Sequence, residues 1–176
     1  MNALSFKDVC KKALLSAMAV TVAVALPWLC HLLGGQLGLG SGLGEMLLPM
    51  HLPVMMAGMM GGPVVGLVCG VVSPLVSFAL TGMPMPAMLP FMMVELAAYG
   101  LAAGLLRRKQ CPAFVKVLLV QVAGRLARAA ALALAVYGFG FDRLPISLIW
   151  TSISVGLAGI LIQWAILPWM WRRTGR

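Results

Sequence analysis

The chain has 176 residues, of which 62% are hydrophobic and only 10% are charged, and its mean hydropathy is +1.02. Soluble domains are about half apolar and about a quarter charged, so this composition excludes a soluble globular domain and predicts a polytopic membrane protein. The formal net charge of +9 does not indicate nucleic-acid binding, because no segment is long and polar enough to form a water-exposed basic domain. Lipid offers no hydrogen-bond partners and the apolar runs lack the alternation of barrel strands, so the spans are predicted to be helices.

The first apolar run covers about residues 12–33 and follows three lysines. It is longer than the core of a signal peptide and no clear cleavage site follows it, so we predict a retained first span after a short amphipathic start at residues 1–10. Ala13 and Ala17 form a small-xxx-small pair in this run. Small residues let helices approach closely in lipid, so this pair predicts a docking face for another helix.

A glycine-rich segment follows, from Gly34 to Glu45, with the sequence GGQLGLGSGLGE. It is too polar and too flexible to span a membrane, and loops of this length often act as lids. We therefore predict a long outside loop between the first and second spans that gates a pocket, with Gly34, Gly40 and Gly44 as its flexible points.

The stretch from Leu47 to Leu106 contains no lysine or arginine and is interrupted by two clusters of glycine and proline, at residues 61–63 and 81–86. One span needs about 20 apolar residues and Gly/Pro clusters mark turns, so this stretch predicts three helices. With two further spans near the C-terminus, we predict an all-α integral membrane protein whose residues 1–176 form one six-helix domain. The six spans are expected at about 12–33, 46–60, 64–80, 87–106, 113–137 and 146–171.

The basic residues predict the orientation of these spans. Of the 13 lysine and arginine residues, ten would lie inside if both termini are cytoplasmic, with Lys12 and Lys116 counted at the inner ends of their spans. Arg143 would lie outside, and Arg125 and Arg128 lie deeper in the fifth span. This distribution fits the positive-inside rule, so we predict cytoplasmic N- and C-termini.

Three polar residues of the predicted fifth span form the first candidate site. Gln121, Arg125 and Arg128 are spaced i, i+4 and i+7, so they share one face of a helix. A charge inside a span is costly and usually faces a cavity or a partner, and arginine is suited to a carboxylate. The spacing favours a pocket for an anionic ligand; the alternatives are an internal ion pair with Glu95 or an arginine that reaches the interface.

Two more polar residues lie within the predicted spans. Glu95 is expected to hold one of the arginines in place, or else to contact a polar group of a ligand. His51 is expected to hydrogen-bond a substrate or coordinate a metal, or else to be a polar interface residue. The four cysteines have no CxxC spacing, so no dedicated metal site is predicted. The chain also lacks the HExxH, GxSxG and P-loop patterns, so we predict neither an enzyme nor an ATP-driven motor.

Three segments of the sequence carry a family resemblance: PMHLPVMMAGMMGGPVVGLVCGVVSPLVSFALTGMPM, VELAAYGLAAGLL, and AGRL in the fifth span. Over about residues 13–170 the chain resembles the substrate-binding S component of energy-coupling factor (ECF) transporters, in the branch with pantothenate, folate and riboflavin carriers. The resemblance implies a subunit of the prokaryotic cytoplasmic membrane that binds a micronutrient near the outer face. It also implies partners, namely a transmembrane coupling subunit that meets Ala13 and Ala17, and two cytoplasmic ATPases that use ATP.

The sequence leaves several identities open for the ligand. Arg125 and Arg128 offer two cations, which suits a ligand with two carboxylates such as folate or haem, whereas pantothenate needs only one. Haem would also suit the methionines and would take His51 as an axial ligand. We therefore predict that the ligand is an anionic vitamin or other cofactor, with a haem-specific S component as the alternative. An intramembrane enzyme or an assembly protein is a remote alternative.

Overall fold

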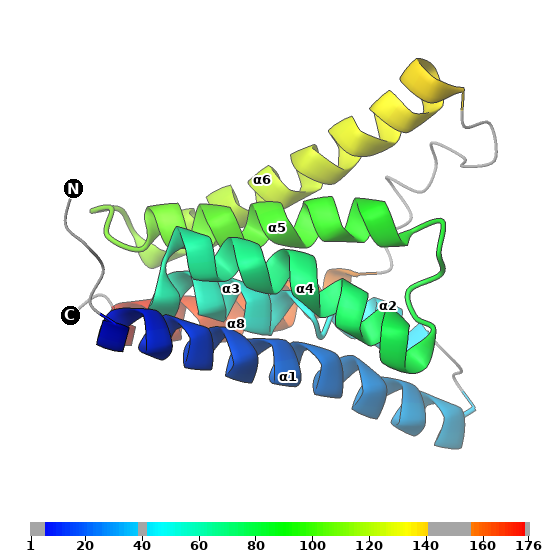
Figure 1. The fold of residues 1–176 in the computed structure, drawn as a ribbon, viewed down its shortest axis with the longest axis horizontal. Coiled ribbons are helices and arrows are strands. Elements are labelled where there is room, and N and C mark those ends of the chain that lie inside the picture. Colours follow the sequence, from blue (N-terminus) through cyan, green and yellow to red (C-terminus); the bar gives the residue numbers. More distant parts are fainter. Residues whose placement is uncertain (1–5, 39–41, 141–155, 175–176) are drawn as a thin grey trace.

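A computed structural model describes residues 6–38, 42–140 and 156–174 and shows an all-α bundle (Figure 1). The start of the first helix and the end of the last described helix lie at the same end of the bundle. The described elements, in chain order, are α1 (Phe6–Gln36), α2 (Gly42–Leu47), α3 (His51–Gly61), α4 (Pro63–Thr81), α5 (Leu89–Leu106), α6 (Ala113–Ala133), a π-helical turn (Leu134–Gly138) and α8 (Leu157–Thr174).

Four helices in the described ranges are long and apolar enough to cross a membrane: α1, α4, α5, and α6 together with its π-helical turn. This confirms the all-α class, and it gives four helices of the length and apolar composition that a membrane span needs. The ends of α4 and α5 lie within two residues of the expected 64–80 and 87–106. Proline stands at the first or second position of both helices, where its missing N–H removes no helical hydrogen bond.

The expectation of one continuous helix over 46–60 is wrong. The chain forms two short helices there, α2 and α3, and the 11 residues of α3 rise only about 16 Å, which is too short to cross a bilayer alone. The break lies at Leu48, whose φ of 47° is left-handed. Leu48 precedes Pro49, and a residue before proline is disfavoured in the right-handed helical region. His51 therefore becomes the first residue of α3 instead of a mid-helix residue.

The glycine-rich segment is more ordered than expected. Helix α1 has 31 residues and includes Gly34, which is buried, so Gly34 lies in a helix and not in a loop. Gly44 lies in α2 and is also buried, and a Cβ at Gly44 would lie 2.7 Å from Cε1 of His31 in α1. Gly40 lies outside the described residues. The described parts of the segment are thus mostly helical, and α2 packs on α1 at Gly44.

The start of α1 at Phe6 also extends the first span beyond the expected residue 12, and no separate amphipathic start precedes Lys12 in the described part. At the other end of the chain, residues 146–155 of the expected sixth span, together with Arg143, lie outside the described residues. Helix α8 covers the remainder of that span and continues to Thr174.

Glycines at the crossing of α4 and α5 determine how closely these helices pack. Gly66 and Gly100 face each other, and a Cβ on either would collide with the backbone of the other. Gly70 and Gly104 continue the contact at a spacing of four residues, against Leu96 and the start of α4. This is the small-xxx-small packing of membrane helices. It brings α5, which carries Glu95, into the centre of the bundle.

Candidate functional site

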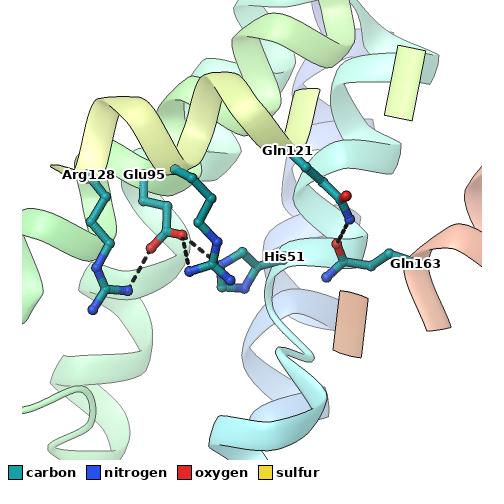
Figure 2. Close-up of polar contacts among 6 residues, drawn as sticks. His51, Glu95, Gln121, Arg128 and Gln163 are labelled. Carbon is teal, nitrogen blue, oxygen red and sulfur yellow. Dashed lines mark hydrogen bonds and ion pairs between the residues drawn. The ribbon is translucent and has the colours of Figure 1, made fainter. Parts of the chain in front are cut away.

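The carboxylate of Glu95 is the centre of a buried polar cluster between α5 and α6. Its side chain is 0% exposed. Arg125 Nη1 lies 3.0 Å from Glu95 Oε1, and Arg128 Nη1 donates to Glu95 Oε2 at 2.8 Å (Figure 2). One carboxylate therefore contacts two guanidinium groups, and the ion pair that was the alternative in the sequence analysis is present for both arginines.

Local packing explains why the arginines reach Glu95. Gly124 lies against the ring of Tyr99, and a Cβ at Gly124 would lie 2.6 Å from Tyr99 Cε2. The glycine lets α6 approach α5, and the next residue, Arg125, is then directed at Glu95. Arg128 follows three residues later on the same helical face.

His51 borders the cluster from the first turn of α3. Its side chain is almost fully buried and its ring packs edge-on against Tyr99, with 5.2 Å between ring centroids. His51 Nε2 lies 3.7 Å from Glu95 Oε1, which is too long for a hydrogen bond. Within the described residues neither ring nitrogen of His51 has a hydrogen-bond partner, and neither does Arg128 Nε.

These unpaired polar atoms define what the cluster can do chemically. A buried polar atom without a partner costs about 1–3 kcal/mol, so a chain usually keeps one only for a reason. Arg128 Nε is a donor on a permanently charged group, and the His51 ring offers one donor and one acceptor when neutral. An acidic group placed here would accept charge-assisted hydrogen bonds, which are about twice as strong as neutral ones.

Gln121, which was expected beside the arginines, contacts a different helix. Its Nε2 donates to Oε1 of Gln163 in α8 at 2.9 Å, and its Oε1 accepts from Nε1 of Trp164 at 2.7 Å (Figure 2). The polar face of α6 therefore serves two clusters, with the arginines turned to α5 and Gln121 turned to α8. Sequence reasoning missed Gln163 and Tyr99. A buried amide in an otherwise apolar run, the signal used for Gln121, would have identified Gln163.

The predicted docking pair lies on the outer surface of α1. Ala13 and Ala17 are both exposed, and the adjacent Leu14 and Met18 are 64% and 60% exposed. Ala23, by contrast, is completely buried against the bundle. The small side chains at 13 and 17 thus leave a shallow apolar face that no described helix covers.

The protein is an apolar helix bundle with a cluster of ion pairs buried inside it. These features define its class: an integral membrane protein with a polar site among its helices. A family model described as the substrate-specific component of ECF transporters matches residues 7–171. The chain belongs to this family: it is a multi-pass membrane protein and the substrate-binding subunit of a transporter, and not an enzyme. Comparison with curated proteins and with solved structures gives no match.

Proposed function

We propose that this S component captures an acidic micronutrient at the outer face of the cytoplasmic membrane and delivers it inward. Its partners in this proposal are a transmembrane coupling subunit and two cytoplasmic ATPases. Family membership supports the transport role. The observation that supports an acidic ligand is the buried cluster of two arginines around one carboxylate, in which Arg128 Nε has no hydrogen-bond partner among the described residues.

In this proposal Glu95 and the ligand share the arginines. Glu95 is bound through Nη1 of Arg128, which leaves Nε of the same guanidinium for an oxygen of the ligand's acidic group. A guanidinium presents five N–H donors in a rigid fork, so it can hold two carboxylates in one plane. Glu95 thus keeps the arginine heads oriented and paired before the ligand arrives, and the site is away from water, where charge-assisted contacts are stronger.

The surfaces around the site suit the rest of the transport cycle. The exposed pair Ala13 and Ala17 is the proposed docking face for the coupling subunit, since bulky side chains there would prevent close helix contact. The segment from Gly34 to Glu45 is the proposed gate, in which α2 contacts α1 through Gly44 and His31. The start of α1 and the end of α8 lie at one end of the bundle. Both segments carry basic residues, which supports cytoplasmic termini.

Haem remains a second candidate ligand, and the unpaired nitrogens of His51 are the observation that favours it. Histidine is a common axial ligand of haem iron. Axial ligation would require the His51 ring to leave its edge-on contact with Tyr99 and its position 3.7 Å from Glu95. Because the arginine cluster needs no such movement to bind an acidic group, a smaller carboxylate ligand is favoured.

The proposed function is tested by native mass spectrometry and an absorption spectrum of the detergent-purified chain, as isolated. We expect a colourless protein that carries the mass of one small carboxylate-containing compound. A Soret band with the mass of haem would select the haem alternative. A retained compound without any acidic group would contradict the proposed role of the arginine cluster.

A further inference from the structure

A short chain of hydrogen bonds joins α6 to α8. Trp164 Nε1 donates to Gln121 Oε1 at 2.7 Å, and Gln121 Nε2 donates to Gln163 Oε1 at 2.9 Å. An indole N–H can only donate, so Gln121 must turn its oxygen to Trp164. The amide nitrogen of Gln121 then faces Gln163, which must accept the hydrogen bond with its side-chain oxygen. One indole N–H thereby determines the orientation of both amides.

This polarity leaves a donor at the end of the chain of bonds. The Nε2 amide of Gln163 is buried, and among the described residues it has no hydrogen-bond partner, while the residue as a whole is 2% exposed. Turning the amide over would place a donor against the Gln121 amide nitrogen and lose the 2.9 Å bond. Gln163 therefore presents N–H groups, and not a carbonyl oxygen, to whatever lies beyond it.

The position of Gln163 relates it to the arginine cluster. Its partner Gln121 lies on the same helix as Arg128, seven residues earlier, which corresponds to a rise of about 10 Å along α6. Figure 2 shows His51 between Glu95 and Gln163, with the amide end of Gln163 directed toward His51. The unpaired donor thus lies on the same side of α6 as the site, beside Gln121 and about two helical turns nearer the start of α6 than Arg128.

We propose that Gln163 Nε2 is a second ligand contact and that it selects a neutral hydrogen-bond acceptor, a carbonyl oxygen or a ring nitrogen, on the ligand. The ligand class is then an elongated molecule with an acidic group at the arginines and a neutral acceptor further along α6, at a spacing on the order of the 10 Å rise between Arg128 and Gln121. This inference rests on the proposed function, because it uses the arginine cluster as the site for the acidic end.

The chemistry of an amide favours a neutral acceptor over a second acid. An ionised group buried away from water needs a charge partner as well as hydrogen bonds. In the described part of the chain the hydrogen bonds that reach Gln163 come from an amide, which carries no formal charge. A carbonyl oxygen or ring nitrogen is satisfied by one or two N–H donors and brings a smaller desolvation cost.

The test is isothermal titration calorimetry of the full-length chain in detergent with four probes. Folate and biotin carry an acidic group and a distant carbonyl. Pantothenate has an amide carbonyl closer to its acidic group, and pimelate has no neutral acceptor. The variants are Gln163→Leu, Arg128→Ala, and Gln110→Leu as a matched control, since Gln110 is exposed between α5 and α6. Each variant is also melted without ligand, so that a folding defect is separated from a binding defect.

We expect folate or biotin to bind most tightly, and we expect Gln163→Leu to lower the affinity for that probe about tenfold. This is the cost of losing one hydrogen bond and leaving its partner unsatisfied. The same variant should leave pimelate affinity unchanged, and Gln110→Leu should change nothing. Equal affinities of Gln163→Leu and wild type for the best probe, with Arg128→Ala impaired, would overturn the second contact and leave the proposed function standing; an ordered water would then satisfy the amide. Full binding by Arg128→Ala, or no binding by any probe to the wild type, would count against the proposed function itself.

Discussion

Replacing Arg128 with lysine separates the structural role of this residue from its proposed ligand-binding role. The guanidinium of Arg128 uses Nη1 for Glu95 at 2.8 Å and has Nε unpaired. Lysine keeps the charge but replaces the planar fork with a compact ammonium group on a flexible stem. Its three N–H donors share one nitrogen, so they cannot hold Glu95 and a ligand in the geometry of the fork. The ion pair with Glu95 should therefore survive while the ligand contact is lost.

The magnitude follows from the bond that disappears. A hydrogen bond to a charged group contributes about 1.5–3 kcal/mol, and each 1.4 kcal/mol is a factor of ten in affinity. Arg128→Lys should therefore weaken binding of a carboxylate ligand roughly 10- to 100-fold. The thermal unfolding midpoint of the ligand-free protein should change by only a few degrees, because the buried carboxylate keeps a cation beside it.

The assay is isothermal titration with the carboxylate ligand that the wild-type chain binds, paired with a melting curve of each protein in the same detergent. Arg108→Lys is the control, because Arg108 is exposed beyond the end of α5. Wild-type affinity in Arg128→Lys would refute the reasoning, since it would mean that the fork of donors is not used. A large loss of stability in the ligand-free variant would instead assign Arg128 a purely structural role.

Three further outcomes are expected. Glu95→Gln removes the carboxylate that both guanidinium groups contact, and breaking a buried ion pair costs about 3–5 kcal/mol. The melting temperature of the ligand-free protein should therefore fall sharply, and ligand binding should raise it by more than it does in the wild type. An unchanged melting curve would argue against the ion pairs. Gly100→Ala places a methyl against the backbone of Gly66 and should destabilise the bundle by at least the ~1–3 kcal/mol typical of overpacking, measured as loss of folded protein on size-exclusion chromatography. Ala17→Leu on the exposed face of α1 should spare ligand binding but abolish uptake when the coupling subunit and ATPases are co-expressed, and normal uptake would exclude that face as the docking site.

Much of the fold follows from simple sequence rules because each rule acts within one helix. The apolar runs, their lengths and the clusters at residues 61–63 and 81–86 place α4 and α5 to within two residues. The spacing of four between Gly66 and Gly70, and between Gly100 and Gly104, is visible in the sequence as well. Which glycine faces which is not, since that depends on the crossing of two helices.

The candidate site was predicted in part for the same reason. The shared face of Arg125 and Arg128 is a property of one helix, and pairing with Glu95 was one of the alternatives because few acids lie in the spans. The split of the α6 face between two clusters required knowledge of where α5 and α8 lie around it. For this reason Gln121 was grouped with the arginines, whereas it bonds Gln163.

The prediction of one continuous second span was wrong for a local reason. The reason is a known effect of proline on the residue before it, which a hydropathy average does not detect. Leu47 to Met60 is apolar enough to read as one helix, yet Pro49 restricts Leu48, and the chain turns there with a left-handed φ. The turn shortens α3 and makes His51 its first residue, beside Glu95. A proline rule applied before the hydropathy reading would have found this break.

The central claim is that the arginine cluster around Glu95 binds the acidic group of a micronutrient. The most direct measurement compares the affinity of the wild-type chain for its carboxylate ligand with that for the methyl ester of the same ligand. The ester is larger by one methyl group and carries no charge, so its carbonyl oxygen can still accept hydrogen bonds from Arg125 and Arg128, but the pairing of opposite charges is lost. We predict that the acid binds at least about tenfold more tightly than the ester, and equal affinities would contradict the account.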